Sequence, residues 1–99
     1  MVNEKVLKRE NGVQYLIQVR AHADSYSDCT LNYRVDVFFR LKNQKKWIQL
    51  EKTIMEHEYR RLSMDARRAY DEANMLRFVT KEEIYAAKLE LWNKLKPEN

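Results

Sequence analysis

Apolar and polar side chains alternate along residues 31–41, and this period of two constrains the fold more than any other feature of the chain. In an extended strand, successive side chains point to opposite faces of a sheet, so the alternation separates two sets of residues. One face would carry Leu31, Tyr33, Val35, Val37, Phe39 and Leu41. The other would carry Asn32, Arg34, Asp36, Phe38 and Arg40. The segment therefore predicts a strand with one buried face and one basic face that holds a single aromatic ring.

Two other extended runs flank Asn11-Gly12. This dipeptide is the strongest short signal for a hairpin with a two-residue turn, in which both residues adopt positive φ. After the turn, Tyr15, Ile17 and Val19 share one face. Residues 22–29 are polar, as in a loop, and residues 46–52 follow a lysine-rich turn as a fourth extended run. We therefore expect an antiparallel sheet of four sequential strands.

Beyond residue 53 the spacing of apolar residues changes to that of helices. Thr53 with Glu56 and Thr80 with Glu83 fit the capping box, and Ser63 marks a third helix start. These signals predict helices near 54–62, 64–76 and 81–96, the last stopped by Pro97. The middle helix carries a narrow stripe rich in small side chains, which would let it lie close on the sheet: Ala66, Ala69, Tyr70, Ala73 and Leu76.

Together these elements predict a single α+β domain over residues 1–99, in the order ββββααα. The chain is 44% hydrophobic, which is enough for a core at this length. The residues that we expect to be buried are Tyr15, Ile17, Val19, Tyr33, Val35, Val37, Phe39, Ile84 and Leu91.

The last helix is apolar around more than half of its circumference, whereas a surface helix needs a stripe of roughly 100°. The surplus predicts a second contact. Burial against both the sheet and neighbouring helices is the favoured interpretation. The alternative is self-association through Tyr85, Leu89 and Trp92, which would make the protein a homodimer.

Residues that could carry catalysis or bind a metal are few. His22, Asp24, Asp28 and Cys29 lie within eight residues, but a structural zinc site uses four N or S ligands, usually in paired units. The one glycine, Gly12, belongs to the hairpin and leaves no glycine-rich phosphate loop. We therefore expect no enzymatic activity, no metal and no cofactor.

The net charge of +4 lies in the first half of the chain. Residues 1–52 carry ten Lys and Arg against six Asp and Glu, whereas residues 53–99 carry nine of each. The surplus gathers around the basic face of the predicted sheet and the turn beside it. We predict a binding surface there, formed by Arg20, Arg34, Phe38, Arg40, Lys42, Lys45, Lys46 and Trp47.

Arg and aromatic side chains are enriched at the energetic centres of protein interfaces. The sequence therefore favours a small binding protein without enzymatic activity, an inhibitor or adaptor of a larger protein or protein–nucleic acid complex. It is similar in style to short regulators carried by phages. The alternative is an RNA or single-stranded DNA binding protein, because aromatic rings stack bases and cations contact phosphates. A face that contacts only solvent is the third interpretation.

The expected location is the cytoplasm. The lone cysteine, Cys29, allows no intrachain disulfide, and the first residues contain no apolar leader. No apolar run approaches the ~20 residues that a membrane span needs, so we expect no membrane partner.

Overall fold

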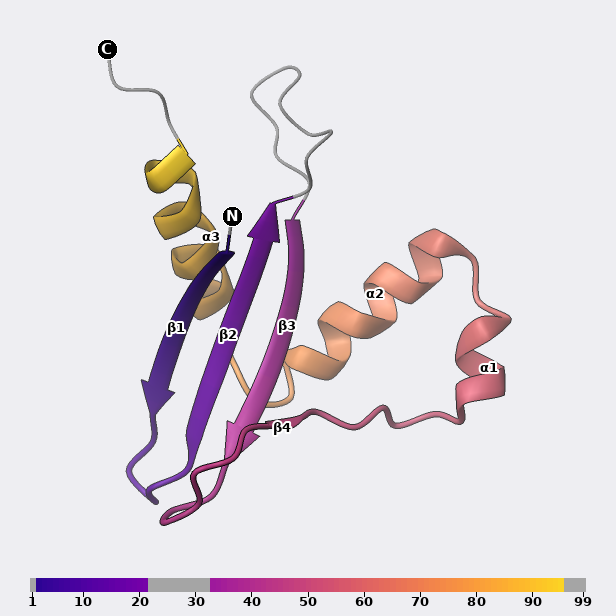
Figure 1. Cartoon of the computed structure of the whole chain (residues 1–99). Helices are drawn as coiled ribbons and strands as arrows, with labels where there is room; N and C mark the ends of the chain where they lie inside the picture. Colours follow the sequence, from indigo (N-terminus) through magenta and orange to yellow (C-terminus); the bar gives the residue numbers. More distant parts are fainter. Residues whose placement is uncertain (1, 22–32, 96–99) are drawn as a thin grey trace.

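The structure, a computed structural model, describes residues 2–21 and 33–95. One antiparallel sheet is formed by β1 (Val2–Lys8), β2 (Gln14–Ala21), β3 (Tyr33–Arg40) and β4 (Ile48–Gln49), in that order. Three helices follow, α1 (Glu56–Arg60), α2 (Met64–Met75) and α3 (Lys81–Leu95) (Figure 1). The predicted ββββααα order of an α+β fold is confirmed. The fourth strand is shorter than predicted, since only two of its residues pair with β3.

The turn between β1 and β2 differs from the predicted two-residue turn. The Arg9 N–H donates to the Val13 carbonyl at 2.9 Å, which leaves three residues in the loop. Within this loop only Gly12 has a positive φ, at 87°, as the last residue of such a loop requires. A two-residue turn would have placed Val6 opposite Ile17, but the longer loop places Val6 opposite Leu16. The shift matters because one residue of register moves a side chain to the other face of the sheet.

The core lies between α3 and the inner face of the sheet, the face that carries Ile17, Val19 and Val37. These three residues are buried together with Val79, Ile84, Ala87 and Leu91. Five residues of the predicted core are thus confirmed: Ile17, Val19, Val37, Ile84 and Leu91. Burial of the other four was wrong, because Tyr15, Tyr33, Val35 and Phe39 are only half-buried. Among the described helices, α3 alone covers the inner face extensively, and it packs on β1 and β2.

The middle helix, α2, does not lie along the sheet as its small-residue stripe predicted. It extends past β3, away from β1 and β2 (Figure 1). Ala69 and Ala73 of the stripe are exposed, and only the end of α2, at Met75, joins the core. The radius of gyration is 15.0 Å, compared with about 13 Å for a compact chain of this length. Residues 50–75, with α1 and α2, therefore form an arm that projects from the sheet.

The arm is held by polar contacts as well as by packing. The Tyr70 hydroxyl accepts hydrogen bonds from the backbone N–H groups of Thr53 and Ile54. Asn74, which is buried, donates to the Glu51 carbonyl at 3.0 Å. Both contacts tie α2 to the extended segment that leads into α1.

The helix starts agree with two of the three capping predictions. Ser63 accepts from the Ala66 N–H at 3.2 Å, and Thr80 and Glu83 exchange hydrogen bonds of 2.9 and 3.1 Å. The capping box expected at Thr53 and Glu56 is wrong. There α1 begins only at Glu56, after Met55, because the Thr53 hydroxyl pairs with Tyr70 at 2.8 Å.

Candidate functional site

The outer face of the sheet is the face opposite α3, and an apolar row crosses its centre. Val6, Leu16 and Phe38 lie directly opposite one another on β1, β2 and β3. Side chains so paired have Cβ atoms about 5 Å apart and pack together. Leu16 is only 7% exposed, although no helix covers it, because its two neighbours in the row shield it. Val6 remains 47% exposed, so the row presents an apolar surface to solvent.

Cationic side chains lie on both sides of this row. Toward one end of the strands, Arg20 lies opposite Arg34, and both are exposed. Toward the other end, Arg40 lies opposite Gln14, and its Nε donates to the Gln14 side chain at 2.6 Å. The predicted residues Arg20, Arg34, Phe38 and Arg40 are thus brought onto one face, with Phe38 between the arginines.

The remaining predicted binding residues lie at the turn after β3. Lys42, Lys45 and Lys46 are exposed there. The Lys42 side chain lies against Gly12, where an added Cβ would come within 3.0 Å of it, so this turn and the β1–β2 loop are adjacent. The Arg40 guanidinium lies 4.3 Å from the centre of the Trp47 ring. Trp47 therefore packs against Arg40 in a cation–π contact, which leaves Phe38 as the apolar centre of the surface.

Acidic groups interrupt the positive charge of the outer face. Asp36 forms an ion pair with Arg34, with Nε and Oδ2 3.3 Å apart. Glu4 accepts a hydrogen bond of 3.0 Å from Gln18, and Gln18 accepts one from Arg20. The polar residues on this side of the apolar row thus carry both signs of charge. They are Glu4, Gln18, Arg20, Arg34 and Asp36. The strongest cluster of like charge is the lysine turn at the end of the sheet.

The surface on α3 that was predicted for self-association is exposed only in part. Tyr85 is 66% exposed and Leu89 42%, whereas Trp92 is half-buried. The interpretation that neighbouring helices bury the surplus arc is wrong, because the arm carries α1 and α2 away from α3. Self-association through Tyr85, Leu89 and Trp92 stays a prediction.

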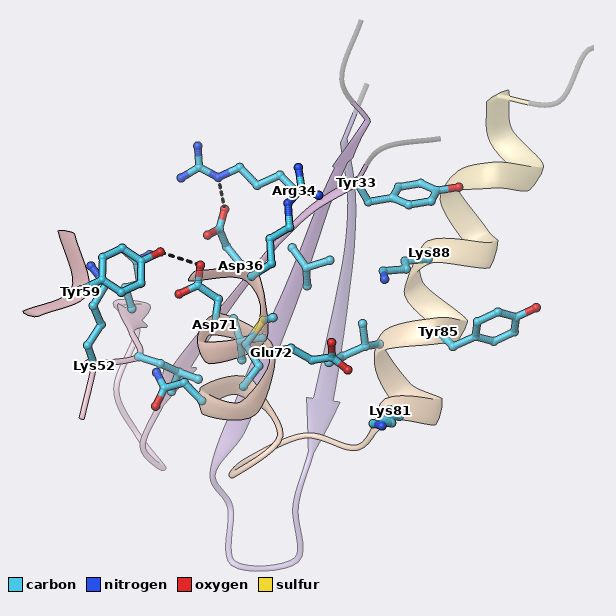
Figure 2. A pocket seen from close by; sticks show the side chains of 18 of the residues that line it. Tyr33, Arg34, Asp36, Lys52, Tyr59, Asp71, Glu72, Lys81, Tyr85 and Lys88 are labelled. Atoms are coloured by element: carbon cyan, nitrogen blue, oxygen red, sulfur yellow. Dashed lines mark hydrogen bonds and ion pairs between the residues drawn. The ribbon is translucent and has the colours of Figure 1, made fainter. Parts of the chain in front are cut away.

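A groove of about 910 Å³ lies between the arm, β3 and α3. Its floor is apolar and includes Val35, Leu50 and Met75. Figure 2 shows α2 on one side, with Asp71 and Glu72, and α3 on the other, with Lys81 and Lys88. Arg68 also lines the groove from α2, so the α2 side carries both signs of charge, whereas the charged residues of the α3 side are basic. The groove was not predicted, since the sequence indicated a middle helix on this part of the sheet.

Two of the tyrosines that line the groove, Tyr59 and Tyr33, have raised pKa values. The Tyr59 hydroxyl donates to the Asp71 carboxylate at 2.7 Å, and this bond raises the pKa of Tyr59 above its ordinary value. Burial raises the pKa of Tyr33, whose ring lies 5.9 Å from the Lys88 ammonium. Both hydroxyls thus stay protonated at neutral pH.

Among the described residues, no group of three or more His, Cys, Asp or Glu is arranged to hold a metal ion. The candidate cluster His22, Asp24, Asp28 and Cys29 lies outside the described residues, as do Leu31, Asn32 and Pro97. Within residues 2–21 and 33–95, no helix has the length and apolar character to cross a membrane.

Comparison with known proteins found no matching family model, curated protein or solved structure.

Sequence reasoning missed Val6, which extends the apolar row of the outer face onto β1. Its exposure depends on the register of the hairpin, and the register depends on a loop that is one residue longer than the Asn-Gly signal indicated. The uncovered backbone edge of β3 was also missed. Residues 46–52 read as a full extended run in the sequence, so no local signal indicated that only two of them pair with β3.

Proposed function

We propose that the protein is a small, non-enzymatic binding protein that recognises another protein through the outer face of its sheet, as an inhibitor or adaptor. The observation that carries this proposal is the row of Val6, Leu16 and Phe38 with cationic residues on both sides. An apolar centre inside a charged rim is the usual arrangement of a protein interface. Phe38 would bind in a pocket of the partner, and the lysine turn would steer the approach of an acidic surface.

The test is affinity capture from a cell lysate with three forms of the tagged protein, with and without nuclease. Phe38→Ala removes the apolar centre, and Tyr85→Ala, which removes a more exposed aromatic ring from α3, is the control. We expect captured proteins that survive nuclease, persist with Tyr85→Ala and are lost with Phe38→Ala. Purified partner should then dissociate at least tenfold faster from Phe38→Ala. Equal capture by all three forms would contradict the proposal.

RNA or single-stranded DNA is the second candidate, and the observation that favours it is the exposed lysine turn at Lys42, Lys45 and Lys46. Oligo(dT) and oligo(U) of twenty nucleotides test it by fluorescence anisotropy. Log affinity would fall linearly with log salt between about 50 and 200 mM, and Lys45→Glu with Lys46→Glu would remove roughly two units of that slope. An affinity that does not fall over this range of salt would rule this candidate out. So would the absence of any binding to either oligonucleotide. The interspersed carboxylates of Glu4 and Asp36 make protein the better supported partner.

A further inference from the structure

The edge of β3 from Tyr33 to Asp36 is unpaired within the part of the chain that the structure describes. β4 pairs with Phe38 and Phe39, and the last bond on this side joins the Leu50 N–H to the Val37 carbonyl at 3.3 Å. In an antiparallel sheet, the backbone groups of alternate residues point to the same edge. Those of Val35 and Tyr33 therefore point the same way as the Val37 carbonyl, toward the open side. Such an edge can accept a further strand.

The sequence of this edge, Tyr-Arg-Val-Asp-Val, is complementary to itself when two copies run antiparallel. With Val35 opposite Val35 of a second copy, Arg34 lies opposite Asp36 and Tyr33 lies opposite Val37. Two opposite-charge pairs then form across the junction on the outer face. Cross-strand pairs of opposite charge stabilise an antiparallel ladder, whereas like charges in the same positions destabilise it. The charge pattern therefore favours a second copy of this chain as the occupant.

The groove provides a further reason to expect a second copy of the chain at this edge. It borders the open edge, and all five residues from Tyr33 to Val37 line it. The two-fold axis of such a pair is perpendicular to the sheet, so both inner faces lie on the same side. Because α2 extends past the β3 edge (Figure 1), each arm would reach toward the part of the other copy's inner face, next to β3, that α3 does not cover extensively. The inner side of β1, by contrast, is closed by α3 through Asn3 and Lys5, which bond to Ala87 and Glu90.

We propose that the protein forms a two-fold dimer in which the β3 edges of two copies pair antiparallel about Val35 and join the two sheets into one of eight strands. This inference is independent of the proposed function, which needs only one chain. It would place the outer faces of both copies side by side. Arg20 and Arg34 of each copy would then lie close to the axis.

Charge exchange at the edge tests the dimer. Arg34→Asp places two carboxylates opposite each other in a homodimer, and Asp36→Arg places two guanidinium groups there. Sedimentation equilibrium over a range of concentrations should show each single variant dissociating at least tenfold more readily than the wild type. An equimolar mixture of the two variants restores both opposite-charge pairs. We expect that mixture to form a heterodimer with about the affinity of the wild type.

The double variant Arg34→Asp with Asp36→Arg keeps a carboxylate and a guanidinium two residues apart, so it does not depend on the folding of the single variants. It should dimerise with itself and fail to pair with the wild type, since mixed pairing brings like charges together. Leu89→Glu on α3 is the control and should leave the dimer intact. A wild type that is monomeric at all concentrations would overturn the inference. So would a dimer that ignores the charge exchanges, or a free pairing of wild type with the double variant.

Discussion

Arg9 and Glu83 join the end of β1 to the first turn of α3 through two parallel hydrogen bonds, each 2.8 Å long. Glu83 also accepts the Thr80 N–H, so one carboxylate caps the helix and anchors it to the sheet. Arg9 donates in addition to the Phe78 carbonyl at 3.1 Å. Two residues separated by 74 positions thus fix where α3 begins on the inner face. Parallel donation from one guanidinium to one carboxylate is the strongest form of this contact.

This pair predicts a specific dependence of stability on acid. The hydrogen bonds from Arg9 lower the pKa of Glu83 from 4.5 to about 2. Because the folded pKa is depressed, the stabilisation is complete above about pH 5 and is lost as the pH falls toward 2. The two side chains are 34% and 22% exposed, so solvent screens part of the effect. We expect Glu83→Gln to lower the free energy of unfolding by about 1–2 kcal/mol at pH 7.

Urea denaturation of wild type and Glu83→Gln between pH 2 and pH 7 checks this prediction. The difference between the two proteins should shrink steadily below about pH 5 as the wild type takes up the proton. Glu82→Gln, at the exposed neighbouring position, is the matched control and should follow the wild type. A constant difference over the whole range would mean that the stabilisation does not come from the ionised carboxylate.

Neighbouring valines on β3 should differ in their effect on stability. Both line the groove, but Val37 is buried in the core with residues of α3, whereas Val35 is only half-buried. Val37→Ala leaves a cavity in packed surroundings and should cost about 2 kcal/mol, but Val35→Ala should cost about half as much. Thermal or urea denaturation measures both. Equal losses would indicate that the groove is closed in solution.

The sequence predicts the fold well where the signal is local. Alternation over residues 31–41 indicates β3, and the capping pair Thr80 and Glu83 places the start of α3 to the residue. The sequence does not predict the fold where contacts between residues far apart in the chain decide the arrangement. The small-residue stripe of α2 indicates a close contact but does not say with what, and in the structure Tyr70 holds the helix to the segment after β4 instead.

The binding surface shows the same division. The sequence assigns Arg34, Phe38 and Arg40 to one face because their spacing alone decides the face. Val6 joins them only through the register of β1 on β2, which is set by the geometry of a three-residue loop. The open edge of β3 depends on how far β4 pairs. No local pattern specifies that extent.

The arm should unfold separately from the rest of the molecule when Tyr59 is replaced. The Tyr59 hydroxyl bonds to Asp71, and its ring packs edge-on against Tyr70 with centres 5.7 Å apart. With five residues, α1 is too short to be stable without such contacts. We expect Tyr59→Ala to increase amide hydrogen exchange in α1 at least tenfold and to leave the exchange of β2 unchanged.

Tyr59→Phe separates the two contributions, since it removes the hydroxyl and keeps the ring. Its effect on exchange in α1 should be smaller than that of Tyr59→Ala. Tyr85→Ala, on the exposed side of α3, is the control for loss of an aromatic ring. Faster exchange throughout the sheet with Tyr59→Ala would show that the arm and the sheet unfold as one unit.

Opposite sides of α3 should respond differently to change. Leu91 is fully buried against the sheet, whereas Leu89, two residues earlier, is 42% exposed. Leu91→Ala should therefore destabilise the protein by about 2–5 kcal/mol, as expected for a leucine in a packed core. Leu89→Glu should change the free energy of unfolding by less than about 0.5 kcal/mol, because it exchanges one solvated side chain for another. Denaturation curves and the sedimentation mass of the Leu89→Glu variant check both its stability and its oligomeric state. A lower mass than that of the wild type would place the self-association surface on α3, with Tyr85, Leu89 and Trp92, rather than on the edge of β3.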